Sequence, residues 1–167
     1  KPELFARSSG SAHAAPQVAG RPYGAVPPGA RIALGHLPPD AATNWLGYVA
    51  VASGRQVEIH QHNMGAPEWR SGPIALPIDD ATPVPRFPDR GRAVFLATGR
   101  AGDRAALAGV VAAPGAPPQS PWAVPIAALP RLSACAFGAS GAVAVILVAD
   151  DGGSARVTRV DVDESGA

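Results

Sequence analysis

Glycine and proline recur along this chain between short apolar runs, and no other feature restricts its possible folds as strongly. The 167 residues include 19 Gly and 19 Pro. Because both residues interrupt helices and mark turns, a chain punctuated in this way cannot sustain long helices. The runs between them are short and rich in Val and Ala. This pattern predicts an all-β, antiparallel domain with many short strands.

The apolar runs set the bounds of the expected strands. We expect strands at 31–37, 45–52, 56–62, 69–76, 92–98, 104–113, 122–129, 132–139, 142–149 and 155–162. The segment 103–113 is rich in Ala and also suits a helix, but Gly109, Val110 and Val111 favour a strand. Residues 143–148 form an unbroken apolar run, which predicts a strand buried on both faces.

The first 30 residues differ from the rest of the chain. They are rich in Pro, Gly, Ala and Ser and show no apolar period. We therefore expect an irregular arm or linker at 1–30, held by contact through scattered apolar residues, and a single all-β domain at 31–167. Since the chain begins at Lys1, we expect a processed product or a piece of a larger polypeptide.

The expected strands repeat with a period of about 40 to 46 residues, which is typical of repeat proteins. Three units are predicted, at 45–90, 91–132 and 133–167, each running strand, Gly turn, strand, longer loop, strand. The clearest landmark is a Trp followed by Pro-Ile-Ala and then Leu-Pro. It occurs at Trp69–Pro77 and at Trp122–Pro130, and the third unit lacks it. We expect Trp69 and Trp122 to begin the third strands of their units.

Over residues 45–162 the chain resembles a β-propeller-type repeat protein, on the strength of this period, strand order and landmark. The resemblance implies propeller blades, each a small antiparallel sheet. A single β-sandwich or barrel, with the similarity arising from composition, stays open as the alternative.

Charge and composition exclude several classes of partner. The net charge is +1, which offers no electrostatic footprint for nucleic acid. No apolar stretch reaches 18 residues, so we expect no membrane span. Lys1 is the only lysine beside many Arg, a bias typical of a high-GC bacterial genome. Cys135 is the single cysteine, so no intrachain disulfide forms. The sequence does not fix the compartment, and an extracytoplasmic location is favoured.

Two groups of residues are candidates for catalysis. Glu58, His60 and His62 alternate along one expected strand and therefore share a face, where they are candidate metal ligands with His36 as a fourth. Ser140 lies in a Gly-rich turn but lacks the flanking Gly spacing of a nucleophile elbow, since position 142 is Ala. The alternative interpretation is an exposed polar strand face and an ordinary turn.

Glu68, Trp69 and Arg70 are candidate ligand-binding residues, because an aromatic ring flanked by charged groups suits a sugar. Trp122 has no such neighbours, and a core role for the Trp residues is the alternative.

No catalytic or cofactor motif stands out, so the leading hypothesis is a non-enzymatic binding or assembly module. We expect it to be a subunit or fragment of a larger protein or complex, with a protein partner or further copies of itself and no cofactor. One alternative is a hydrolase or metal-dependent enzyme that uses His60 and His62 or Ser140. Another is a carbohydrate-binding module that uses Trp69.

Overall fold

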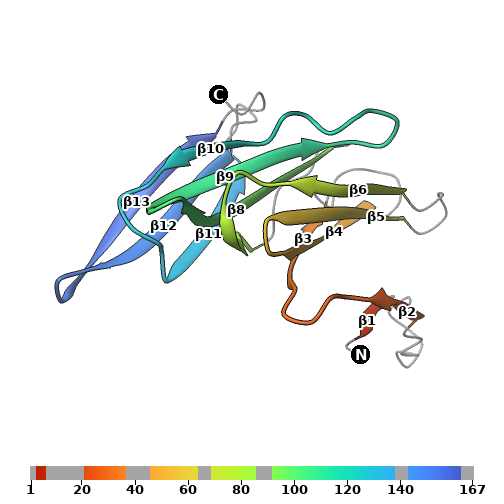
Figure 1. The fold of residues 1–167 in the computed structure, drawn as a ribbon, viewed down its shortest axis with the longest axis horizontal. Coiled ribbons are helices and arrows are strands. Elements are labelled where there is room, and N and C mark those ends of the chain that lie inside the picture. The colour runs from red at the N-terminus through yellow and green to blue at the C-terminus, as the bar shows by residue number, and fades with distance from the viewer. Residues whose placement is uncertain are drawn as a thin grey trace, which may run out of the picture. The chain divides into compact units, whose positions relative to one another are not determined.

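The structure is a computed structural model that describes residues 3–6, 21–36, 46–63, 69–85, 92–137 and 143–162 (Figure 1). The chain divides into two compact units, Lys1–Ala30 and Arg31–Ala167. In the first unit, β1 (Glu3–Ala6) pairs antiparallel with β2 (Arg21–Ala25), so the arm that was expected to be irregular contains a short strand pair.

The second unit consists of strands and turns throughout its described residues, which confirms the all-β prediction. Its strands are β3 (Arg31–His36), β4 (Leu46–Ser53), β5 (Gln56–Asn63), β6 (Trp69–Ala75), β7 (Asp79–Pro83), β8 (Ala93–Ala101), β9 (Arg104–Ala112), β10 (Trp122–Pro125), β11 (Leu132–Phe137), β12 (Val143–Asp151) and β13 (Ser154–Val162). The segment that also suited a helix is strand β9, where Val and Gly outweigh the helix propensity of Ala.

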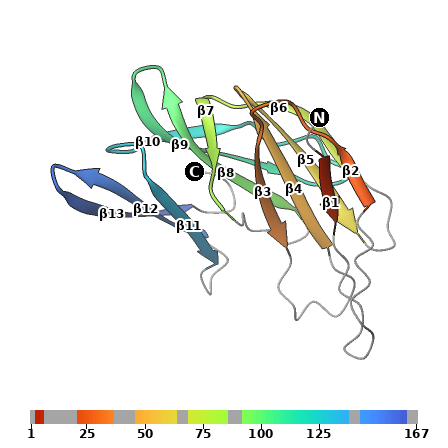
Figure 2. The ribbon, with the colours of Figure 1, turned by 90° about the horizontal axis from the view of Figure 1, so that it is seen from below.

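These strands form three antiparallel sheets in which neighbours in sequence are neighbours in space. The first sheet has the order β3-β4-β5-β6, the second has β7-β8-β9-β10 and the third has β11-β12-β13. Figure 2 shows the three sheets in succession, coloured orange to yellow, yellow-green to cyan and blue. Each sheet is therefore a local meander, built without any long crossover.

The first two sheets begin one strand earlier than the predicted units, whereas the third sheet begins with β11, as its unit does. Strand β3 opens the first sheet, and β7 opens the second sheet from within the segment that was expected to be a Pro-rich connection. Proline in this segment suggested a loop, but β7 is an edge strand, where Pro83 is tolerated because one side of the strand needs no donors. The β7–β8 pairing also contains a bulge between Asp79 and Thr82, which weakens the strand pattern in the sequence.

One hairpin recurs in all three sheets. Strands β4 and β5, β8 and β9, and β12 and β13 are each joined by a two-residue turn. The turns begin with Gly54, Gly102 and Gly152, whose φ angles are 58°, 64° and 56°. Glycine adopts this left-handed conformation without steric cost, and such turns match the twist of a hairpin. Counting from the turn glycine therefore identifies equivalent positions in the three sheets.

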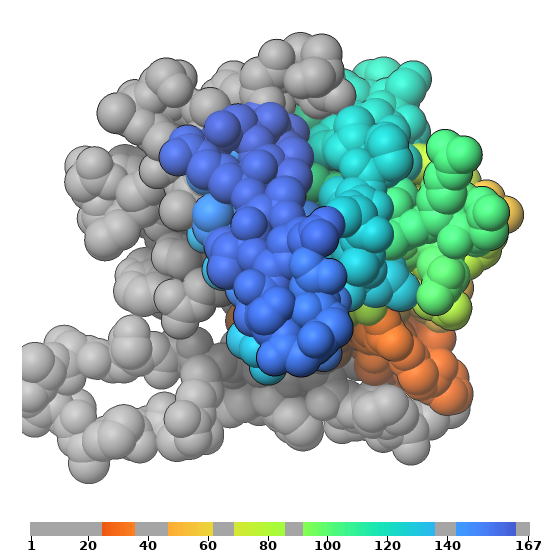
Figure 3. Space-filling model, turned by 90° about the vertical axis from the view of Figure 1, so that its left-hand side faces the viewer, coloured from red at the N-terminus to blue at the C-terminus, as the bar shows by residue number. Residues whose placement is uncertain are grey.

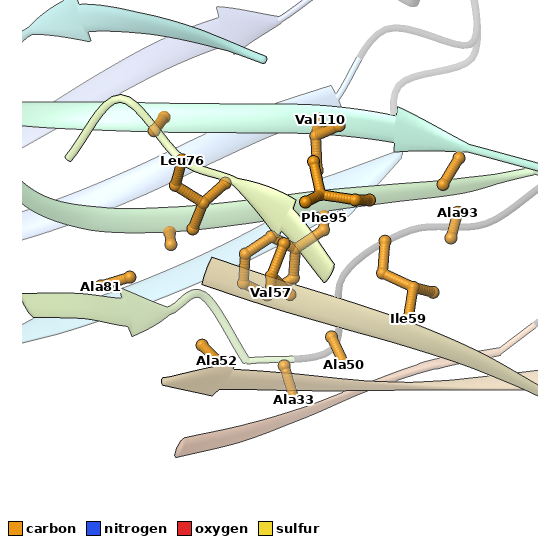
Figure 4. Close-up of a cluster of buried hydrophobic side chains, with 14 of the residues drawn as sticks. Ala33, Ala50, Ala52, Val57, Ile59, Leu76, Ala81, Ala93, Phe95 and Val110 are labelled. Carbon is orange, nitrogen blue, oxygen red and sulfur yellow. The ribbon is translucent and has the colours of Figure 1, made fainter. Parts of the chain in front are cut away.

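The core lies in two layers, one on each side of the second sheet. On β8, Phe95 contributes to a first cluster with first-sheet residues such as Ile59, whereas Leu96 contributes to a second cluster with third-sheet residues such as Val145. Figure 4 shows the first cluster, where β4, β5, β8 and β9 present Ala, Val, Ile and Phe side chains to one another. Because successive residues of a strand point to opposite faces, the unbroken burial of β8 from Ala93 to Gly99 means a sheet covered on both sides.

The third sheet is buried on one face only. In β12, Val143, Val145 and Leu147 are buried against the second sheet, while Ile146 and Val148 between them are half-buried. The expectation that 143–148 is buried on both faces is therefore wrong. An unbroken apolar run indicates two apolar faces, but burial also requires a neighbouring layer.

Trp69 and Trp122 occupy equivalent places. Each is the first residue of the fourth strand of its sheet, rather than of the third strand as expected. Trp69 packs on the cluster between the first and second sheets, and Trp122 packs on the cluster between the second and third. Ile74 belongs to the first of these clusters, and Ile126 packs against the second. Both Trp residues thus lie on the face toward the following sheet, which gives the Trp landmark a structural meaning.

The first strands of the first two sheets approach each other. Strand β7 lies near β3 and β4. The Arg31 guanidinium on β3 donates a hydrogen bond to the carbonyl oxygen of Asp80 at 3.3 Å and another to the hydroxyl of Thr82. Arg55 in the β4–β5 turn contacts the Asp79 carboxylate at 3.3 Å. These contacts place the first strand of the second sheet beside the first two strands of the first sheet.

Candidate functional site

The histidine row lies on the face of the first sheet that points away from the second sheet. Glu58 and His60 are on β5, and the buried residues Val57 and Ile59 occupy the opposite face. Nε2 of His60 lies 3.1 Å from Oε1 of Glu58. The side chains of His62 and His36 lie outside the described residues. Where side chains are described, no group of three or more His, Cys, Asp or Glu could hold a metal ion.

The candidate sugar-binding residues Trp69 and Arg70 lie on opposite faces of β6. Trp69 is half-buried against the first core cluster, whereas Arg70 is exposed. Adjacent strand residues point to opposite faces, so the Trp69 ring and the Arg70 guanidinium do not converge on one ligand. Glu68 lies outside the described residues, and so does Ser140. The structure therefore brings Glu58 and His60 together but separates Trp69 from Arg70.

Cys135 is not an activated nucleophile. Its side chain packs against the second core cluster, and its thiol donates to the carbonyl oxygen of Pro85 at an Sγ–O distance of 3.6 Å. Burial disfavours the charged thiolate and raises the pKa of Cys135 from 9.0 to about 11. Since the thiolate is the reactive form, this environment suits a structural cysteine.

The most distinctive surface of the second unit is the outward face of the third sheet, formed by Leu132, Ile146, Val148 and Val157. These residues are neighbours across the strands, because Leu132 pairs with Val148 and Val148 pairs with Val157. Leu132 is 61% exposed and Val157 is 66% exposed. Large apolar side chains that adjoin on a surface are typical of interaction sites, whereas scattered ones are not. Figure 3 views the molecule from this side, with β12 and β13 in blue at the front.

Equivalent positions in the other sheets show what this face resembles. Five residues after the turn glycine come Ile59, Leu107 and Val157, and the first two are fully buried by the sheet that follows. Six residues before it come Tyr48, Leu96 and Ile146, of which Tyr48 and Leu96 are buried in the same way. The third sheet therefore carries apolar residues at the positions that receive the next sheet elsewhere in the molecule.

Sequence reasoning missed Leu132 and Val157 as candidates, although the signal was present. An alignment of the three hairpins on their turn glycines puts Val157 at the same position as the core residues Ile59 and Leu107. Without a structure, nothing distinguishes a covered apolar face from an uncovered one.

Comparison with known proteins gives no match, whether with family models, with curated proteins or with solved structures. Within its described residues, the chain has no helix of the length and apolarity needed to cross a membrane.

Proposed function

We propose that this chain is a non-enzymatic binding or assembly module, built of consecutive β-propeller-type blades and acting as a subunit or fragment of a larger assembly. The observation that carries this proposal is the apolar outward face of the third sheet. An apolar face of this kind is stabilised when another surface removes it from water.

The blade assignment rests on the succession of sheets. Each sheet is a meander of neighbouring strands, each packs face to face on the next, and a Trp recurs at the start of the fourth strand in the first two. In repeat proteins each unit contacts its neighbours, and the same contact geometry recurs along the array. A second sheet covered on both faces is the arrangement expected of an internal blade.

A capture experiment tests the proposed function. The bait is the tagged chain, in an extract of the organism that produces it. A second bait carries Leu132→Asp and Val157→Asp. The wild-type chain should retain a protein, or further copies of itself, that the variant loses. Ala101→Asp, on an exposed position at the end of β8, is the control because it adds a negative charge away from this face. A wild-type chain that stays alone, in the extract and in its native mass spectrum, would contradict the proposal.

The metal-dependent alternative has one observation in its favour. Oε1 of Glu58 lies 3.1 Å from Nε2 of His60, and a carboxylate beside one histidine nitrogen orients the ring so that its other nitrogen can bind a metal. Elemental analysis of the purified chain decides this alternative. It requires a stoichiometric transition metal that disappears in the His60→Ala variant, and metal-free wild-type protein would exclude it.

A further inference from the structure

We infer that the outward face of the third sheet binds the outward face of the first sheet of a second copy of this chain, head to tail. This inference rests on the proposed function, to which it adds the identity of the partner. It follows from the direction of the two sheet contacts inside the molecule and from the residues on the two outward faces.

Both internal contacts have the same direction. The face of the first sheet that carries Tyr48 and Ile59 packs on the second sheet, and the equivalent face of the second sheet, with Leu96 and Leu107, packs on the third. The third sheet presents the same face, with Ile146 and Val157, to the outside. A second copy that docks by its first sheet repeats a contact that the chain already makes twice.

The apolar parts of the two faces correspond in position. First strands oppose first strands inside the molecule, because β7 lies near β3 and β4. The same order places β11 of one copy against β3 of the other. Leu132 on β11 is 61% exposed, and Ile32 and Leu34 on β3 are 40% and 57% exposed. Docking therefore removes apolar side chains of both copies from water.

The charged parts also correspond. On the outward face of the third sheet, the third strand, β13, carries Arg159. On the outward face of the first sheet, the third strand, β5, carries Glu58. Arg159 is already bonded to Asp161 at 2.8 Å, but that pair is well exposed. Exposed pairs of this kind are weak, so the guanidinium can share a second carboxylate at low cost. Opposite charges on the third strands of the two faces favour this pairing over a contact between two third sheets.

The outward face of the first sheet is more polar than its internal counterparts. Four and six residues after the turn glycine, it carries Glu58 and His60, where the second sheet carries the buried Ala106 and Ala108. Val51 and His60 on this face are already buried, so the accessible contact consists of β3 and the Glu58 carboxylate. A less apolar face suits an association between chains that fold separately.

The experiment measures the native mass of the purified full chain and of two variants. Wild-type chains should form a particle of two or more 16.8 kDa chains, as a closed ring or an open series, since a head-to-tail contact permits both. Val157→Asp removes the third-sheet contact, Leu34→Asp removes the first-sheet contact, and each variant should be monomeric. Ala101→Asp should keep the wild-type mass. Circular dichroism verifies folding, and Leu132→Asp replaces Val157→Asp if the latter unfolds.

A mixture of the two variants distinguishes this arrangement from its rivals. Val157→Asp keeps an intact first sheet and Leu34→Asp keeps an intact third sheet, so the mixture should form a particle with one chain of each kind. If Leu34→Asp alone keeps the wild-type mass, third sheets meet each other and the inference is overturned. A monomeric wild-type chain also overturns it, yet the proposed function survives if capture still finds a different protein on this face.

Charge exchange sharpens the test. Arg159→Glu should raise the dissociation constant about tenfold, the size expected for losing one interfacial charge pair. Adding Glu58→Arg in the same chain should restore most of the affinity. Failure of this restoration would contradict the alignment of β13 with β5.

Discussion

The second and third sheets have similar strands but opposite surroundings. In β8 every residue from Ala93 to Gly99 is buried, whereas in β12 buried and half-buried residues alternate. Both strands are almost wholly apolar, so composition does not account for the difference. The second sheet has a neighbour on each face and the third has one described neighbour. An apolar strand therefore has side chains that can be buried on both faces, and the neighbouring sheets determine whether they are.

The largest effect should come from emptying the core beside the second sheet. Phe95→Ala removes a fully buried ring from the first cluster and should lower the free energy of unfolding by about 3–5 kcal/mol. Leu132→Ala, on the exposed face of the third sheet, should cost at most about 0.5 kcal/mol. Urea unfolding measures both losses, at a protein concentration low enough to keep the chains monomeric. Equal losses would remove the contrast between the sheets.

The two faces of β12 can be compared within one strand. Leu147, 3% exposed, faces the second sheet, and its replacement by Ala should cost about 2–5 kcal/mol. Ile146→Ala, on the outward face, should cost clearly less under the same dilute conditions because water already reaches this side chain. If Ile146→Ala is as damaging as Leu147→Ala, the third sheet is covered on both sides.

A smaller loss is expected at Gly109, where β9 passes beneath the Trp122 ring. A Cβ atom at this position would approach ring atoms of Trp122 more closely than real Cβ atoms do. Gly109→Ala should therefore cost about 1–3 kcal/mol through overpacking. Combining it with Trp122→Leu should give less than the sum of the two single losses, because the clash disappears. Additive losses would show that the ring does not rest on this glycine.

The smallest effect concerns Cys135, which packs between the second and third sheets. Below pH 9.0 the thiol is neutral in the folded and unfolded chains. Between pH 9.0 and about 11 the unfolded chain loses its proton while the folded chain keeps it, so stability falls as pH rises. Iodoacetamide at pH 9 should modify the folded chain much more slowly than the urea-unfolded chain. Cys135→Ser should lack this contribution to the pH slope, and equal alkylation rates would place the thiol in solvent.

Local features of the fold were predictable from particular residues. Gly54, Gly102 and Gly152 mark hairpins because the tight turn requires a left-handed residue, and the strands around them follow from alternating or continuous apolar runs. Strand β7 was missed because Pro83 and its bulge are typical of a loop, and because its pairing with β8 cannot be read from β7 alone. Of the candidate sites, the contact between Glu58 and His60 was implied by their spacing. The opposite directions of Trp69 and Arg70 also followed from strand geometry.

The sequence by itself determined the all-β class, the hairpins, and the apolar face that each strand presents, since these depend on residues a few positions apart. Only the tertiary structure decided which apolar faces meet. It placed the second sheet between the first and third, turned Trp69 and Trp122 toward the following sheet, and left Leu132 and Val157 exposed. The physical reason is that burial belongs to pairs of surfaces. A strand encodes its own apolar surface, but the partner surface comes from residues distant in the chain or from another molecule.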